Sequence, residues 1–279
     1  MPQPHATSFY SEVYNAIKNW APDGRANVGH TGRYATALNL LRNVAQPQMR
    51  VLDVASFGTI VPVLRWVLGF RDITVTGLPM DGVEPHGKLQ LPATPDGEIF
   101  ACAYDRFDIE GPFTYADESF DVVILTEVLE HLTRDPMHTI GELNRITRTG
   151  GWLLLSTPNC CSLRSVLKAL RGQHPYIWCP YSKHAHRDRH NREYTPDEVR
   201  AVLECAGYEV VKLLTRDESY GPRASWARSS LRWLANRAVV LASLTAGRYV
   251  GPSLRGESIF ALARKTGPVQ DRFPEFLYY

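Results

Sequence analysis

Short segments of almost wholly apolar residues alternate with helix-like segments along this chain of 279 residues, and this alternation constrains its fold most strongly. The clearest apolar segments are 50–56 and 120–126. Strands that are apolar on both faces are typical of a parallel sheet covered by helices on both sides. When such strands alternate with helices, the expected fold is a doubly wound α/β sheet. We predict that class of fold here.

The expected elements follow from the same patterns. Strands are predicted at seven places, which are 50–56, 73–77, 98–104, 120–126, 152–157, 208–214 and 257–265. Helices are predicted at 60–70 and 135–149, and a third is predicted to begin after Thr195. In that third helix, Thr195, Pro196 and Glu198 stand in the order of a capping box with proline at the first helical position.

The remaining segments divide the chain. Residues 1–47 are predicted to form an N-terminal helical cap on a domain that covers 48–279. Two insertions interrupt that domain: 158–193 is polar, aromatic and rich in histidine, and 217–255 contains a helical segment at 225–246. We interpret 158–193 as the part that binds substrate and metal. The helix at 225–246 is a candidate lid, homodimer contact or cover for the core.

The charge balance and the cysteine content indicate which cellular compartment and which classes of partner to expect. The chain has 31 Lys and Arg against 29 Asp and Glu, and this near-neutral balance counts against a nucleic-acid partner. Its five cysteines form no C-x-x-C pair and are odd in number, as expected of reduced thiols in a cytoplasmic protein. We see no signal peptide and no uninterrupted apolar run of about 18 residues, so we expect no membrane span.

In an open parallel sheet, ligands bind beyond the carboxyl ends of the strands. The loops that follow Asp53, Gly77, Tyr104, Thr126 and Thr157 should therefore converge on one site. These loops carry most of the residues that we single out below.

Four segments resemble the class I S-adenosylmethionine-dependent methyltransferases. The first is Val51-Leu-Asp-Val-Ala-Ser-Phe-Gly58, which is similar to the family's first strand and turn, and the others are 108–132, 150–159 and 192–210. The resemblance covers about 48–216 and the last strand. It implies a Rossmann-like methyltransferase sheet of seven strands, mostly parallel with one antiparallel strand, and S-adenosyl-L-methionine as the cofactor.

The resemblance also implies where the cofactor binds. Asp108 would face the adenine amino group, and the other implied cofactor residues are Arg33, Asp53, Ala55, Ser56, Gly58, Asp81, Ile109 and Thr126. Two departures from the family stand out. Ala55 and Phe57 replace the usual glycines, and no acidic residue ends the second strand to bind the ribose, since the nearest carboxylate is that of Asp81. These departures leave open a catalytically silent scaffold that has kept the fold.

A second constellation suggests a metal. If a helix starts just after Thr126, Glu127, Glu130 and His131 lie at spacings of three and four residues and share one face. Together with His190 downstream, they resemble the divalent-metal O-methyltransferases. The resemblance implies that Glu127, Glu130, His131 and His190 hold Mg²⁺ or Mn²⁺, with Glu130, His131 and His190 acting in catalysis. The alternative is a solvated basic loop around His190, with His131 as a plain general base.

A bound divalent ion activates a hydroxyl, which is otherwise a poor nucleophile. We therefore predict an O-methyltransferase acting on a small molecule or an oligosaccharide. Tyr176, Trp178 and Tyr181 in the first insertion suit stacking on sugar faces, and we favour a sugar hydroxyl such as that of a mannoside. A phenol or catechol and the 2′-hydroxyl of RNA remain open as alternatives.

Overall fold

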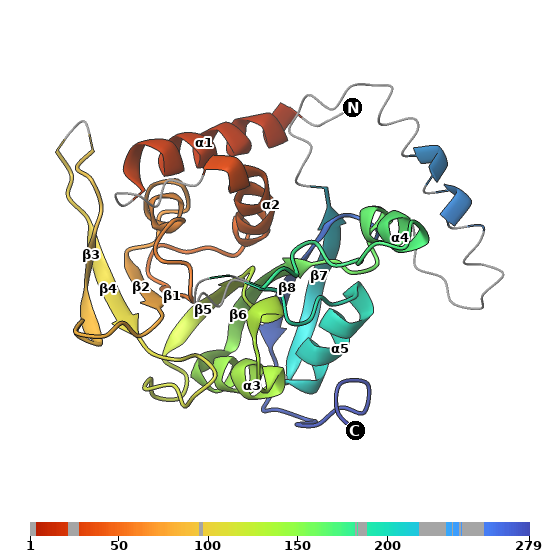
Figure 1. Ribbon diagram of the computed structural model, residues 1–279. Helices are drawn as coiled ribbons and strands as arrows, with labels where there is room; N and C mark the ends of the chain where they lie inside the picture. The colour runs from red at the N-terminus through yellow and green to blue at the C-terminus, as the bar shows by residue number, and fades with distance from the viewer. Residues whose placement is uncertain are drawn as a thin grey trace.

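The computed structural model describes residues 4–21, 28–94, 97–181, 183, 189–217, 233–235, 237–239, 241 and 254–279. Its centre is one mixed β-sheet (Figure 1), with the strand order β3-β4-β2-β1-β5-β6-β8-β7. The strands are β1 Arg50–Asp53, β2 Asp72–Gly77, β3 His86–Gln90, β4 Ala101–Arg106, β5 Phe120–Thr126, β6 Thr147–Pro158, β7 Tyr208–Arg216 and β8 Ser258–Lys265.

The doubly wound, mostly parallel sheet predicted from the sequence is confirmed, but the strand count is not. The sheet has eight strands rather than seven. β8 runs antiparallel to β6 and β7, and the additional strand β3 runs antiparallel to β4 at the sheet edge. In β3 only Leu89 is buried, as is common for an edge strand with one neighbour. Its sequence therefore lacks the apolar run by which the other strands were recognised.

Helices cover both faces of the sheet. They are α1 Pro4–Trp20, α2 Thr31–Leu41, α3 Pro136–Ile146, α4 Leu163–Leu170 and α5 Pro196–Cys205, with short turns of helix at Val28–His30, Val63–Val67 and Leu129–His131. The predicted capping box of α5 is present, because the Glu198 N–H donates to Thr195 Oγ1 at 3.2 Å and the Thr195 N–H donates to Glu198 Oε2 at 2.8 Å. The helix predicted at 225–246 falls largely outside the described residues.

Alternate residues of each central strand feed two hydrophobic cores. In β5, Val122 and Ile124 pack with α1 and α2, whereas Val123 and Leu125 pack with α3 and α5 on the opposite face. Figure 1 shows the two helix pairs on opposite sides of the sheet. Burial on both faces explains why these strands read as continuous apolar runs.

Within 1–47, α2 packs on β6 and β8 of the sheet, and α1 packs on α2 and on the short helix Val63–Val67. Val13 and Ile17 of α1 and Leu38 of α2 are fully buried in the same core as β1 and β2. The division into a cap and a domain stays a prediction. In the part of the chain that the structure describes, no helix has the length and apolar character needed to cross a bilayer.

Candidate active site

A cavity of about 580 Å³ opens at the carboxyl ends of β1, β2, β4 and β5. Its lining comes from the loops after these strands and consists of Ala55, Phe57, Leu78, Asp108, Ile109, Glu110, Glu127, Val128, His131 and Leu132. The predicted convergence is therefore observed for the loops after β1, β2, β4 and β5, whereas the loop after Thr157 contributes no lining residue. The lining combines apolar side chains with three carboxyl groups and one imidazole.

The turn after β1 places two side chains in an unusual backbone conformation. Ala55 and Phe57 have φ values of 56° and 57°, in the left-handed region that favours glycine. These are the two positions at which the sequence departs from the glycines of the resembled family. The turn has thus kept the backbone path of a glycine-rich loop while gaining side chains on the cavity wall.

Asp53 lies beneath this turn at the end of β1. Its side chain is fully buried, and it accepts a hydrogen bond from the hydroxyl of Ser56. Burial raises the pKa of Asp53 to about 7, against the opposing effect of the Ser56 hydroxyl. Ser56 in turn accepts the N–H of Gly58 at 3.1 Å. Asp53, Ser56 and Gly58 therefore shape the turn rather than line the cavity.

The strain at Phe57 yields a stability prediction. A left-handed conformation costs a residue other than glycine about 1–2 kcal/mol, and the Phe57 side chain is 45% exposed on the cavity wall. Allowing for the greater freedom of glycine in the unfolded chain, we expect Phe57→Gly to raise the free energy of unfolding by about 0.5–1 kcal/mol. Urea denaturation would measure this. Phe57→Leu keeps the strain and should give no gain; destabilisation by Phe57→Gly would contradict the prediction.

Asp108 forms the polar end of an apolar part of the cavity. Leu78 and Ile109 line the cavity near it, and Asp108 Oδ1 accepts the N–H of Glu110 at 3.0 Å. Arg134 Nη2 lies 2.5 Å from Asp108 Oδ2. Glu110 fixes the loop that carries Arg134, since its Oε1 accepts the backbone N–H groups of Thr133 and Arg134 at 2.7 and 2.6 Å.

Glu127 does not join the other acidic and histidine side chains as the sequence predicted. The helix expected directly after Thr126 begins only at Leu129, and Glu127 has a left-handed φ of 56°. This backbone turn directs its carboxylate to Ser156 Oγ, which donates at 2.8 Å, and to the guanidinium of Arg33. The guanidinium also contacts His30, whose pKa is lowered by burial and then by the charge of Arg33.

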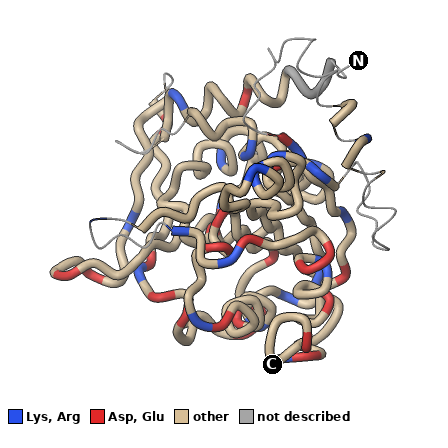
Figure 2. Tube along the Cα trace, turned by 45° about the vertical axis from the view of Figure 1, so that its right-hand side comes forward, with Lys and Arg blue, Asp and Glu red and all other residues tan. Residues whose placement is uncertain are grey.

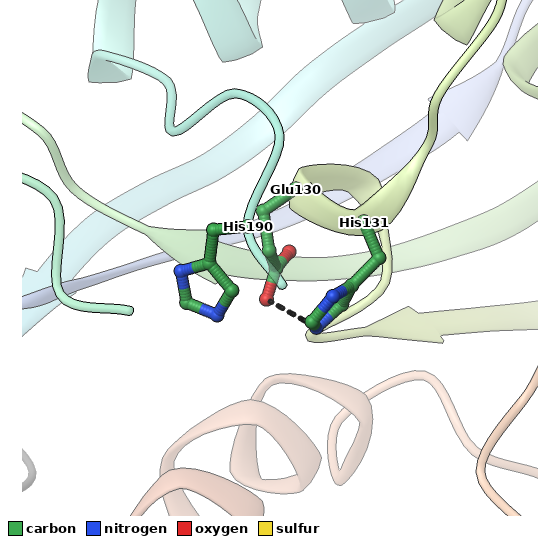
Figure 3. A group of neighbouring side chains, drawn as sticks. All are labelled: Glu130, His131 and His190. Atoms are coloured by element: carbon green, nitrogen blue, oxygen red, sulfur yellow. Dashed lines mark ion pairs between the residues drawn. The ribbon is translucent and has the colours of Figure 1, made fainter. Parts of the chain in front are cut away.

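The other three residues of that prediction do come together. Glu130, His131 and His190 each offer one ligand atom, and these atoms all lie within 4.8 Å of one another. Figure 3 shows the Glu130 carboxylate between the two imidazole rings. Glu130 Oε1 is 3.8 Å from His131 Nε2, and the two rings lie edge to face with centroids 4.9 Å apart. His131 also lines the cavity, so the group adjoins it.

Glu130 is a buried carboxyl with half of its hydrogen-bonding capacity unused. Only 1% of the residue is exposed, and its Oε2 accepts the Thr157 hydroxyl at 2.9 Å. Its Oε1 is buried and has no hydrogen-bond partner among the described residues. Burial, followed by the charge of Glu127, raises the pKa of Glu130 well above its ordinary value. A cation beside Oε1 would remove the cost of burying this carboxylate.

Backbone contacts bring His190 to Glu130 across 60 residues of sequence. The N–H groups of Asn191 and Arg192 donate to the Glu130 carbonyl oxygen at 2.7 and 3.3 Å. The Asn191 side-chain amide donates to the His131 carbonyl oxygen at 2.9 Å, and His131 Nδ1 donates to the carbonyl oxygen of Arg189 at 3.1 Å. Segment 189–192 is therefore fastened to the short helix Leu129–His131.

Some of the predicted cofactor residues lie at the cavity and others do not. Ala55, Asp108 and Ile109 line it. Arg33 binds the lining residue Glu127, and Thr126 is the last residue of β5, directly before Glu127. Asp81 is exposed in the loop after β2 and does not line the cavity, where Leu78 stands instead. Five further residues line the cavity that were not predicted from the sequence, namely Phe57, Leu78, Glu110, Val128 and Leu132. Phe57, Glu110, Val128 and Leu132 lie next to predicted site residues in the sequence, and this was the only available indication of their position.

The aromatic residues of the first insertion lie outside the cavity lining. Trp178 is 49% exposed and Tyr181 is 80% exposed, and the Arg189 guanidinium lies over the Tyr181 ring, 4.1 Å from its centroid. Trp178 is linked to the histidine group, because its carbonyl oxygen accepts the His190 N–H at 3.1 Å.

Comparison with known proteins identifies relatives. A model of the methyltransferase-domain family matches residues 29–213. The chain is 27% identical over 177 residues to a ubiquinone biosynthesis O-methyltransferase of Paracidovorax citrulli, covering 62% of this chain and 68% of that protein. It is 31% identical over 178 residues to the Hahella chejuensis protein of the same name, covering 64% and 69%.

A solved structure has a similar fold. It is a Haloferax volcanii protein described as a methyltransferase in complex with the Trm112 methyltransferase activator. The comparison covers 96% of this chain and all of that one, with a TM-score of 0.54 and 13% sequence identity. At this identity the similarity concerns the fold alone.

Proposed function

The chain belongs to the methyltransferase-domain family, and from that premise we propose that it is an S-adenosylmethionine-dependent O-methyltransferase that uses a divalent metal ion. One observation carries the proposal: Glu130, His131 and His190 form a group of possible metal ligands, and His131 also lines the cavity. The names of the two curated relatives support oxygen as the atom that is methylated.

The residues that line the cavity suit the proposed cofactor in their polarity. Leu78 and Ile109 offer apolar surface for an adenine ring, and Asp108 offers an acceptor for its amino group. Asp108, Glu110 and Glu127 place three carboxyl groups in the lining, each paired with Arg134 or Arg33, and they complement the sulfonium and ammonium charges of S-adenosylmethionine. The ribose would lack the acidic partner expected after β2, because Leu78 occupies that place.

The donor set suits a divalent ion. Glu130, His131 and His190 would supply one carboxylate and two imidazoles, and three protein ligands leave positions open for an acceptor, as in catalytic sites. Two imidazoles favour Mn²⁺ over Mg²⁺, which prefers oxygen ligands. When bound, such an ion lowers the pKa of a coordinated hydroxyl and orients it. Glu127, engaged by Arg33 and Ser156, is not included among the proposed ligands.

The chain's own residues then have separate tasks. The cavity residues would hold the cofactor and the histidine group would hold the acceptor beside it, since methyl transfer is an in-line displacement that depends on placement. His131 belongs to the cavity and to the ligand group, so it joins the two halves of the site. The apolar lining residues Val128 and Leu132 keep water away from the sulfonium.

Two acceptor classes fit this site, and each has an observation in its favour. The exposed ring of Trp178, whose carbonyl oxygen accepts the His190 N–H, favours a sugar hydroxyl. The relatives are named for the biosynthesis of a quinone, which favours a phenol or catechol. RNA is less suited, because Figure 2 shows acidic and basic residues interspersed in that view rather than gathered into a basic face.

The test is a methyl-transfer assay with labelled S-adenosylmethionine against sugars, catechols and single-stranded RNA, each with and without EDTA. We expect transfer to an oxygen in one small-molecule class, and we expect EDTA to abolish it. Calorimetry with S-adenosylhomocysteine distinguishes an enzyme from a scaffold. Failure to bind this product at millimolar concentration would contradict the proposal.

A further inference from the structure

Glu193 is buried beside the proposed metal ligands. Only 3% of it is exposed, and its Oε1 lies 2.7 Å from Nδ1 of His190, three residues earlier in the chain. Neither side chain belongs to the cavity lining. Glu193 is not among the site residues predicted from the sequence, although it lies between His190 and the capping residue Thr195.

We propose that Glu193 is the positioning residue that prepares His190 to bind a metal ion. The inference rests on the proposed function. A carboxylate can only accept, so the proton of the shared hydrogen bond belongs to Nδ1, and the lone pair of the neutral ring belongs to Nε2. Figure 3 shows this second nitrogen turned toward the Glu130 carboxylate.

The negative charge of Glu193 adds to this geometric effect. A carboxylate behind a ligating imidazole fixes the ring and raises its basicity, and loss of such a partner typically costs about 10–100-fold in metal affinity. The equivalent partner of His131 is a neutral group, the carbonyl oxygen of Arg189. His190 therefore has the stronger support of the two histidines.

Glu193 also fixes the neighbouring insertion to His190. Its Oε1 accepts the backbone N–H groups of Ile177 and Trp178 at 2.6 and 3.3 Å. The carbonyl oxygen of Trp178 accepts the His190 N–H in return. One carboxylate thus holds a proposed metal ligand and the backbone of the aromatic segment in a single arrangement.

The test is a titration of the full chain with manganese chloride, followed by electron paramagnetic resonance. Glu193→Gln keeps an oxygen that can accept these hydrogen bonds but removes the charge. We expect it to weaken manganese binding about tenfold or more, with an unchanged melting temperature and unchanged affinity for S-adenosylhomocysteine. A merely structural role would lower the melting temperature and leave the manganese affinity of the folded protein intact.

The matched control is Glu198→Gln. This carboxylate lies on the same segment but contacts Arg192 and the Thr195 N–H, and not His190. We expect it to bind manganese like the wild type. If Glu193→Gln also binds manganese as tightly as the wild type, the inference about Glu193 is wrong and the proposed function stands. If the wild type binds no manganese, both are overturned.

Discussion

His190→Ala is expected to lower turnover by at least about 100-fold while leaving the affinity for S-adenosylhomocysteine nearly unchanged. The physical reason is a separation of tasks within the site. His190 belongs to the proposed ligand group but does not line the cavity, so its removal should weaken activation of the acceptor without disturbing the cofactor. Steady-state kinetics at saturating manganese and product calorimetry would measure the two effects.

His174→Ala is the matched control for that substitution. His174 lies on the same insertion but is exposed and outside the ligand group. We expect it to retain most of the activity. Equal effects of the two substitutions would remove His190 from the catalytic site.

Asp108→Ala is expected to weaken S-adenosylmethionine binding by about 1.5–3 kcal/mol, the range for a hydrogen bond to a charged group. That loss corresponds to roughly 10- to 150-fold in the dissociation constant. The carboxylate lines the cavity, where an adenine amino group would need an acceptor. Calorimetry would measure the affinity, and thermal denaturation would verify that the variant is folded.

Arg134→Ala separates the two roles open to Asp108. The Arg134 side chain is 59% exposed, and such a solvated ion pair contributes little. We therefore expect a small effect on cofactor affinity. If Arg134→Ala weakens cofactor binding as much as Asp108→Ala does, the loss of affinity is due to the broken ion pair and not to a lost contact with the cofactor. Unchanged affinity in Asp108→Ala would remove Asp108 from the cofactor site.

The central strands and the helix after Thr195 could be predicted because local chemistry decides them. Strands β1 and β5 are buried on both faces and read as apolar runs, and the capping box of α5 is complete within four residues. Strand β3 could not be found in this way. It depends on pairing with β4 at the sheet edge, which its own residues do not encode.

Residues of the candidate site could be predicted only from their spacing along the chain or from the resemblance to a known family. The i, i+3, i+4 argument for Glu127 assumed a regular helix, but the chain makes a left-handed turn at Glu127 before a single turn of helix at Leu129–His131. Contact between His190 and Glu130 depends on hydrogen bonds between segments 60 residues apart. Resemblance indicated this contact, whereas periodicity could not.

The most direct test of the account is the metal dependence of methyl transfer by the wild-type chain, using the best acceptor found in the assay above. We expect EDTA to abolish transfer, manganese to restore it after the chelator is removed, and S-adenosylhomocysteine binding to be the same in both states. Full activity in the chelated enzyme would contradict the account, and His131 would then be the candidate for a metal-free general base.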